Sequence, residues 1–187
     1  MTVHAMIDIE TLGTKSDAVV LTVGGVKFNP FTNETPHSPI MYRLDIDEQT
    51  AKGRIVDPGT LEWWSKQDKD IQEEAFSLDN RISVQQFCSE LNKWLVGVNK
   101  KWAQGPRFDY GILEHLFEQY NIHKNWFYWE EADSRTLFEL VPGDPRKDDS
   151  GIQIDHHSAL ADAYNQAIAV QKSYKMLNLQ QNQALST

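Results

Sequence analysis

Asp8 and Glu10 are the first residues in the chain whose types and spacing suit chemistry. They lie in segment 5–10, where apolar and acidic residues alternate as in a strand. Residues two apart in a strand share a face, so their Cα atoms would be about 6.6 Å apart with both carboxylates on one side. Unpaired charges on a central strand are costly, and a divalent cation would neutralise them. The alternative is an edge strand with a solvated acidic face.

A third carboxylate, Asp109, follows a short strand and a break in the pattern. Gly105 and Pro106 interrupt the chain after residues 101–103, and an apolar helical pattern follows Asp109. Asp109 is therefore predicted at or near the N-terminus of a helix. Taken alone, the simplest interpretation is an N-cap, because aspartate is a favoured capping residue and that role needs no chemistry.

His157 and Asp162 form the last group of interest. Ser158 has the chemistry of an N-cap, which places Asp162 about one turn into the final helix and His157 on the preceding loop. A site built from carboxylates does not need the imidazole as a ligand, so His157 would be free to take a proton. The alternative is a solvated loop histidine and a carboxylate that interacts only with the helix dipole.

Strand and helix patterns alternate along the chain, so these residues must be positioned by a layered α/β structure. Three antiparallel strands are predicted, followed by helices and short strands. This order predicts an α/β fold, a mixed β-sheet flanked by helices. We expect one domain over residues 1–177 and a frayed polar tail over 178–187. The predicted strands cover 5–10, 19–28, 40–46, 101–103 and 126–129. A short helix is predicted to start near residue 60, and further helices are predicted over 83–96, 109–120, 134–141 and 158–177.

Composition narrows the class of protein. The chain has 187 residues, of which 40% are hydrophobic, enough for the core of one domain. Lys and Arg number 18 against 27 Asp and Glu, a net charge of −9 that disfavours coating of DNA or anionic membrane by bulk charge. An enzyme whose acids hold metal ions remains compatible with that balance.

The single cysteine, Cys88, excludes an intramolecular disulfide and favours a reducing, cytoplasmic setting. No apolar run approaches the ~18 residues of a membrane span, and the N-terminus does not have the pattern of a signal peptide.

Together, the three elements resemble the DEDD superfamily of 3′–5′ exonucleases, in its DnaQ-like subtype with a histidine base. The first motif of that family, D-x-E, is matched by Asp8 and Glu10. The second, an aspartate that opens a helix, is matched by Asp109, and the third, H-x-x-x-x-D, by His157 and Asp162. The resemblance covers about residues 6–174. Segments 61–67 and 133–137 are similar to the compact phage-type exonuclease A branch and its bacterial exoribonuclease relatives.

The resemblance implies a ribonuclease H-like fold and a 3′–5′ exonuclease that releases nucleoside 5′-monophosphates from single-stranded DNA or RNA, with DNA favoured. It implies two divalent cations, Mg²⁺ or Mn²⁺, held by Asp8, Glu10, Asp109 and Asp162, with His157 as the general base. An exoribonuclease with the same site and a catalytically silent nucleic-acid-binding module are the alternatives. A membrane partner is not expected, and a homodimer is one of the oligomeric states left open.

Residues beside these motifs are candidates for substrate contact. The resemblance implies that Thr11 and Leu12, directly after Glu10, meet the terminal nucleotide, and Phe108 stands before Asp109. Arg135 can pair with a phosphate or form a structural salt bridge.

Trp63 and Trp64 can stack on a base or ribose. Adjacent helix positions point about 100° apart, so we expect one of the two to pack in the core and the other to line the cleft. The remaining tryptophans are predicted as core; they are Trp94, Trp102, Trp126 and Trp129.

Overall fold

The computed structural model describes residues 2–147 and 158–181 and contains one six-stranded sheet in the order β4-β3-β2-β1-β5-β6. The strand that carries Asp8 and Glu10 therefore lies inside the sheet, and the edge-strand alternative is wrong. The strands are β1 (His4–Thr11), β2 (Val20–Phe28), β3 (His37–Leu44), β4 (Arg81–Ile82), β5 (Lys100–Ala103) and β6 (Glu131–Asp133).

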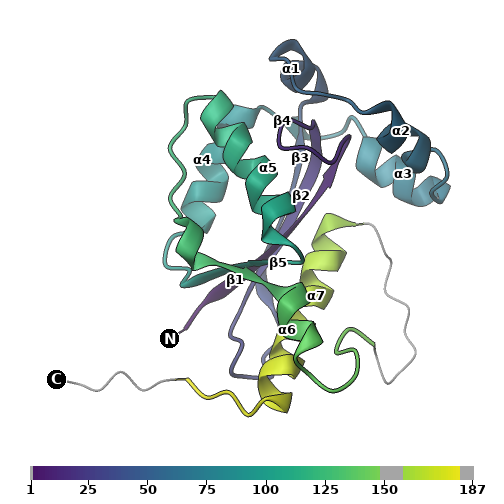
Figure 1. Ribbon diagram of the computed structural model, residues 1–187. Coiled ribbons are helices and arrows are strands. Elements are labelled where there is room, and N and C mark those ends of the chain that lie inside the picture. Colours follow the sequence, from purple (N-terminus) through teal and green to yellow (C-terminus); the bar gives the residue numbers. More distant parts are fainter. Residues whose placement is uncertain (1, 148–157, 182–187) are drawn as a thin grey trace.

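The first three strands form the predicted antiparallel meander (Figure 1). In its register Asp8 lies opposite Gly24 and Glu10 opposite Thr22. Strand β5 runs parallel to β1, and β6 runs parallel to β5. The carboxyl ends of β1 and β5 consequently lie at the same edge of the sheet, and the acidic residues of both segments lie toward that edge.

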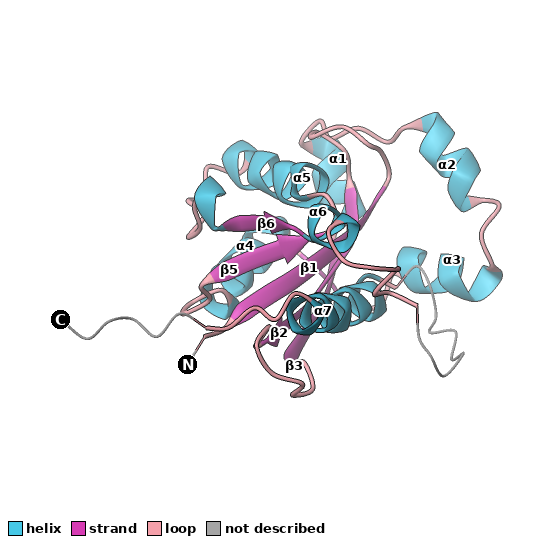
Figure 2. Cartoon of the chain, turned by 60° about the horizontal axis from the view of Figure 1, so that its bottom comes forward, coloured by secondary structure: helices cyan, strands magenta, loops and turns pink. Residues whose placement is uncertain are grey.

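Helices cover both faces of the sheet, with α4 and α5 on one side and α7 on the other (Figure 2). This is the predicted mixed sheet flanked by helices. Within the described residues, no helix combines the length and apolar character that crossing a membrane requires. The helices are α1 (Ile46–Ala51), α2 (Pro58–Trp64), α3 (Lys69–Phe76), α4 (Val84–Trp94), α5 (Pro106–Gln119), α6 (Ser134–Glu139) and α7 (Ala159–Met176), with the 3-10 helix η1 (Tyr128–Glu130).

Alternation along β1 divides its side chains between the two layers. Ile7 and Ile9 are buried in the cluster formed with α4 and α5, and Met6 is buried against α7. Asp8 and Glu10 share the face of Met6, because residues two apart in a strand point the same way. Each large apolar side chain that is fully buried contributes roughly 1.5–3 kcal/mol, so these positions fix which face the carboxylates take.

Two short helices, α1 and α3, and the short strand β4 were not predicted from the sequence. Asp45 is the N-cap of α1, and its carboxylate accepts from the amide of Glu48 at 2.9 Å. Helix α3 spans eight residues and buries Ala75, in one cluster with Trp64 of α2. Both helices are too short for their periodicity to stand out in the sequence.

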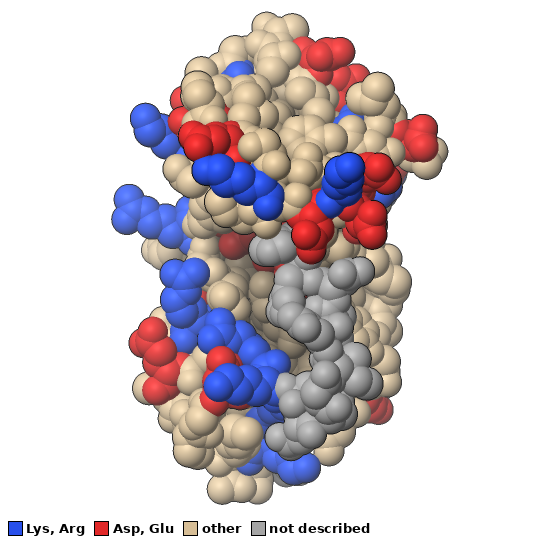
Figure 3. Space-filling model, turned by 90° about the vertical axis from the view of Figure 1, so that its right-hand side faces the viewer, with Lys and Arg blue, Asp and Glu red and all other residues tan. Residues whose placement is uncertain are grey.

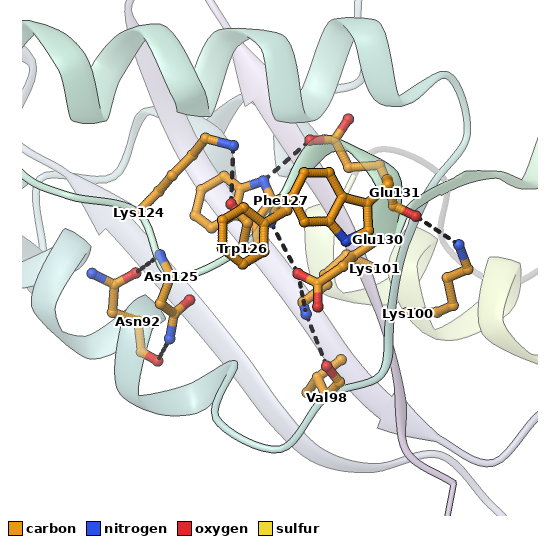
Figure 4. A network of polar contacts seen from close by, with 11 residues as sticks. Asn92, Val98, Lys100, Lys101, Lys124, Asn125, Trp126, Phe127, Glu130 and Glu131 are labelled. Atoms are coloured by element: carbon orange, nitrogen blue, oxygen red, sulfur yellow. Dashed lines mark hydrogen bonds and ion pairs between the residues drawn. The ribbon is translucent and has the colours of Figure 1, made fainter.

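The strand predicted over residues 126–129 is wrong, because the chain forms η1 there and the strand begins at Glu131. The amide of Phe127 donates to the carboxylate of Glu130 at 2.9 Å, and Glu130 also pairs with the buried Lys101 at 3.1 Å (Figure 4). These contacts close a turn where the β-rich composition favoured a strand. Trp126 is buried as predicted, but Trp129 is 58% exposed and stacks on Phe127, so its prediction as core is wrong.

Candidate active site

Asp8, Glu10 and Asp162 form the centre of the candidate site. One carboxylate oxygen from each lies within 4.8 Å of the others. Two of these residues come from β1 and the third from the first turn of α7, more than 150 residues later in the chain. The aspartate of the third sequence motif therefore meets both acids of the first.

Gly24 allows α7 to come this close to the sheet. A Cβ atom built at Gly24 would lie 2.2 Å from the backbone carbon of Ala159 and 2.2 Å from the amide nitrogen of Leu160. Only a residue without a side chain permits this contact between backbones. Because Gly24 is the β2 partner of Asp8, the contact brings the start of α7 directly beside the first carboxylate.

Asp109 is buried, with 4% of its surface exposed, in the first turn of α5. Gly105, with φ +111°, occupies the N-cap position and Pro106 opens the helix, so the N-cap interpretation of Asp109 is wrong. Burial raises the pKa of Asp109 to about 7. Hydrogen bonds from the backbone amides of Asp109 and Ile9 and the nearby charge of Arg135 act in the opposite direction and lower this pKa. The Ile9 amide places this carboxylate beside the strand that carries Asp8 and Glu10.

The carboxylates of β1 are strongly perturbed. Burial and then the charges of Asp109, Glu10 and Asp162 raise the pKa of Asp8 well above its usual range. Burial followed by Asp162, Asp109 and Glu74 raises the pKa of Glu10 to about 8. These acids repel one another in a poorly solvated space, and the arrangement is stable at neutral pH only with protons or cations among them.

The donor set fits a divalent cation. Three oxygens from separate carboxylates converge, and hard cations such as Mg²⁺ and Mn²⁺ prefer oxygen ligands. The face of the molecule drawn in Figure 3 has a hollow. Acidic side chains lie deep inside it, and Lys and Arg side chains lie along one margin. The cluster thus has the charge, the ligand chemistry and the access that a metal site requires.

Gln166 is a site residue that the sequence analysis missed. Its side-chain amide donates to Oδ1 of Asp8 at 3.0 Å and orients that carboxylate. It stands four residues after Asp162 on α7, so the two side chains share a helix face. That i,i+4 spacing was the signal in the sequence, although glutamine at such a spacing is common.

Of the two adjacent tryptophans, one is buried in the core as expected, whereas the expected position of the other in the cleft stays a prediction. Trp64 is buried, and its indole N–H donates to the backbone oxygen of Thr11 at 2.9 Å. Trp63 is 45% exposed and lies edge-on to Trp64 with ring centroids 5.1 Å apart. Trp64 therefore connects α2 to the end of the strand that carries Glu10, and Trp63 is the more exposed of the two.

The remaining candidates for substrate contact differ in exposure. Thr11 and Leu12 are buried, with the Thr11 hydroxyl donating to Gly13 and the Leu12 amide to Val19. Phe108 is 37% exposed beside Asp109. Arg135 is exposed, and its guanidinium donates to the backbone oxygen of Gln104, one residue before the N-cap of α5. Substrate contact by these side chains stays a prediction. His157, the predicted base, lies outside the described residues.

The mixed six-stranded sheet flanked by helices matches the ribonuclease H-like fold of DEDDh nucleases, and the acidic cluster lies at the carboxyl end of its central strand β1. The chain belongs to the family described as the 3′–5′ exoribonuclease Rv2179c-like domain, which matches residues 3–174. It is a DnaQ-like 3′–5′ exonuclease, as the motifs indicated.

Individual relatives agree with the family. An exodeoxyribonuclease of Enterobacteria phage T4 is 24% identical over 160 residues, covering 73% of this chain and 70% of the phage protein. The nuclease domain of 3′hExo, a DEDDh family member bound to rAMP, superposes with a TM-score of 0.62 at 15% identity and covers 98% and 97% of the two chains. Cell-death related nuclease 4 gives a TM-score of 0.62 at 14% identity, covering 94% of this chain and 64% of the other.

Proposed function

We propose that this 3′–5′ exonuclease removes nucleoside 5′-monophosphates one at a time from single-stranded 3′ ends, using two divalent cations. The observation that carries the proposal is the convergence of Asp8, Glu10 and Asp162 within 4.8 Å, with Asp109 buried beside them. A cluster of this charge is costly without cations, and phosphodiester hydrolysis is a reaction that paired cations catalyse.

RNA is the substrate that we place first. The family description, which extends over almost the whole chain, concerns an exoribonuclease. The phage relative, by contrast, is an exodeoxyribonuclease at 24% identity, so single-stranded DNA is the second candidate. DNA, which the resemblance alone placed first, is therefore the alternative that the substrate assay must compare with RNA.

Four carboxylates would hold the cations. Asp8, Glu10 and Asp162 would supply ligands from the cluster of three, and Asp109, buried beside them, would supply a further one. When bound, the ions neutralise charge on the scissile phosphate and lower the pKa of a coordinated water molecule. Gln166 keeps the Asp8 carboxylate oriented through its 3.0 Å hydrogen bond.

The other residues act on the substrate and the proton. His157 accepts the proton of the attacking water, which its place in the sequence, two residues before the first residue of α7, supports. Trp63 stacks on a base near the 3′ end, and Arg135 pairs with a phosphate. Phe108 and the segment of Thr11 and Leu12 border the terminal nucleotide.

A matched pair of oligonucleotides tests the proposal. Single-stranded RNA and DNA of one sequence, labelled at the 5′ end, are incubated with the protein and Mg²⁺ or Mn²⁺. We expect a ladder of products shortened from the 3′ end, with nucleoside 5′-monophosphates identified by mass spectrometry and RNA degraded faster. Asp8→Asn is the inactive control.

Three outcomes would contradict parts of the proposal. Shortening from the 5′ end would overturn the polarity, and faster cleavage of DNA would reverse the order of substrates. Binding of the oligonucleotide without cleavage in either metal would support the silent binding module instead.

The proposal also includes the domain organisation, the cellular compartment and the oligomeric state of the enzyme. Residues 1–177 form one exonuclease domain, which the single continuous sheet supports. Cys88 is buried and free, in keeping with a reducing, cytoplasmic compartment. A homodimer is the oligomeric state to be tested first, by light scattering.

A further inference from the structure

We propose that Glu74, a residue of α3 outside the four acidic motif positions, is a positioning residue that holds the start of α7 and thereby sets Asp162 against Glu10. The inference deepens the proposed function and rests on it for its catalytic consequence. It concerns a single hydrogen bond between two helices that are far apart in sequence.

The bond joins Ser158 to Glu74. The Ser158 hydroxyl donates to Oε1 of Glu74 at 2.8 Å, across a separation of 84 residues. Ser158 is the N-cap residue of α7, yet its side chain makes no capping bond with its own helix. An N-cap serine ordinarily uses its oxygen to accept from the first turn, so this side chain serves a contact with another element instead.

Arginine side chains from the sheet fix the end of α3 that carries Glu74. Arg81 donates to the backbone oxygens of Ala75 at 2.9 Å and of Leu44, at the end of β3, at 2.7 Å. Arg43 of β3 donates to the backbone oxygen of Glu74 at 3.3 Å. These bonds anchor to the sheet the stretch of backbone from which the Glu74 side chain extends.

Figures 1 and 2 show α3 beside the N-terminal end of α7. That end is also in backbone contact with Gly24 of the sheet. Gly24 of the sheet and Glu74 of α3 therefore both contact the start of α7. Asp162 follows Ser158 by four residues and its amide donates to the Ser158 carbonyl at 2.9 Å, so a displacement of Ser158 is transmitted to the metal ligand.

Glu74 also belongs to the electrostatic surroundings of the site. Its charge is among the causes that raise the pKa of Glu10, after burial and the charges of Asp162 and Asp109. Glu74 is thus close enough to sense the carboxylate cluster, although no oxygen of it belongs to the group of three within 4.8 Å. A residue that is near the site and bonded to its framework acts by positioning.

The experiment combines Glu74→Ala, Ser158→Ala and the double variant, with Glu73→Ala as the matched control. Glu73 is the exposed neighbour on the same helix. Because only one hydrogen bond is lost, we expect kcat to fall about tenfold in each single variant, with KM changed less than twofold. The double variant should be no slower than either single variant.

Glu74→Gln separates the hydrogen bond from the charge. Its amide oxygen can still accept from Ser158, so we expect it to retain at least half of the wild-type kcat. The inference would be overturned if the double variant lost kcat by the product of the losses in Glu74→Ala and Ser158→Ala. A wild-type kcat in Glu74→Ala would also overturn it.

A second readout does not depend on activity. Amide hydrogen exchange in residues 159–163 should become faster in Glu74→Ala and Ser158→Ala but not in Glu73→Ala. If the wild-type protein degrades no oligonucleotide, the proposed function fails, and unchanged exchange in these variants would separately overturn the positioning role.

Discussion

Gly24 lies directly opposite Asp8 in the pairing of β1 with β2, and its missing side chain is what lets the backbone of α7 reach the sheet at that point. Strand and helix approach within a distance that no Cβ atom could occupy. The position of Asp162 relative to Asp8 thus depends on a residue that carries no chemical group of its own.

Gly24→Ala should damage both stability and catalysis. The new Cβ would lie 2.2 Å from the backbone of Ala159, which must shift, at a cost of roughly 1–3 kcal/mol in the free energy of unfolding. Urea denaturation and the rate of 3′ shortening measure the two effects. The control is Gly111→Ala in α5, where a Cβ meets nothing within 4 Å and alanine should stabilise the helix by about 0.5–1 kcal/mol. Wild-type stability and rate in Gly24→Ala would show that α7 can move without consequence.

Asp8→Asn should abolish cleavage without destabilising the metal-free protein. The substitution replaces a carboxyl whose ionisation is costly in this buried acidic cluster with a neutral amide, so the melting temperature without metal should be equal to or higher than that of the wild type. Calorimetry and the oligonucleotide assay test this prediction together. The exposed Asp79, changed to Asn, should alter neither property. A strongly lowered melting temperature in Asp8→Asn would mean that the carboxylate is structural.

Stability without metal should fall between about pH 6.5 and pH 8. The pKa values of Glu10, about 8, and Asp109, about 7, lie above those of the unfolded chain, so the folded state binds more protons in this range. Stability that depends on those protons is present at low pH and is lost as pH rises through the folded pKa values. The buried His4, with a pKa lowered to about 4, affects stability only below its ordinary value of 6.5.

Mn²⁺ should reverse this dependence. The cation competes with protons for the same oxygens, so it should raise the melting temperature more at pH 8 than at pH 6.5 and release protons on binding. Scanning calorimetry with and without Mn²⁺ measures both parts. The variant Glu10→Gln should show a flatter curve, and a metal-free melting temperature that rises between the two pH values would contradict the assignment.

Trp63→Ala should weaken substrate binding and leave the fold intact. Stacking on one base is worth about 1–3 kcal/mol, so we expect KM to rise about tenfold with little change in kcat. Trp129→Ala is the matched control, because Trp129 is also exposed but belongs to η1, before the start of β6 and not at the carboxyl ends of the strands. Equal effects of the two substitutions on KM would remove Trp63 from the substrate site.

His157→Ala should lose most of the cleavage rate and retain the affinity for Mn²⁺. The residue is expected to accept a proton and not to ligate a cation, so a titration calorimeter should record unchanged metal binding. His156→Ala, one residue earlier, is the control that should keep the wild-type rate. Weakened Mn²⁺ binding in His157→Ala would identify the histidine as a ligand.

The sequence alone was sufficient for the local features. Alternation in residues 5–10 determined that Asp8 and Glu10 share one face, because strand geometry has a period of two. The spacing of the three motifs indicated the nuclease class, which the family match confirmed. One of the adjacent Trp63 and Trp64 was expected in the core, and Trp64 is buried there.

Local patterns were less reliable where long-range contacts compete with propensity. Residues 126–129 have a β-rich composition, but the ion pair between Glu130 and Lys101 closes a turn there. Asp109 looked like a helix cap, and the structure places Gly105 in that role because only a glycine readily takes its positive φ. In both cases the deciding feature, a long-range ion pair or a backbone dihedral angle, is not contained in the local pattern of residue types.

The relation between distant segments was decided by the tertiary structure alone. Gly24 in the middle of a strand signals a close backbone approach, but its partner, Ala159, lies 135 residues away and no local rule names it. The bonds from Gln166 to Asp8 and from Ser158 to Glu74 likewise join elements that only the packing of α7 brings together. The sequence determined which groups can do the chemistry, whereas the burial that perturbs their pKa values and the contacts that aim them arise from packing, which depends on the whole chain at once.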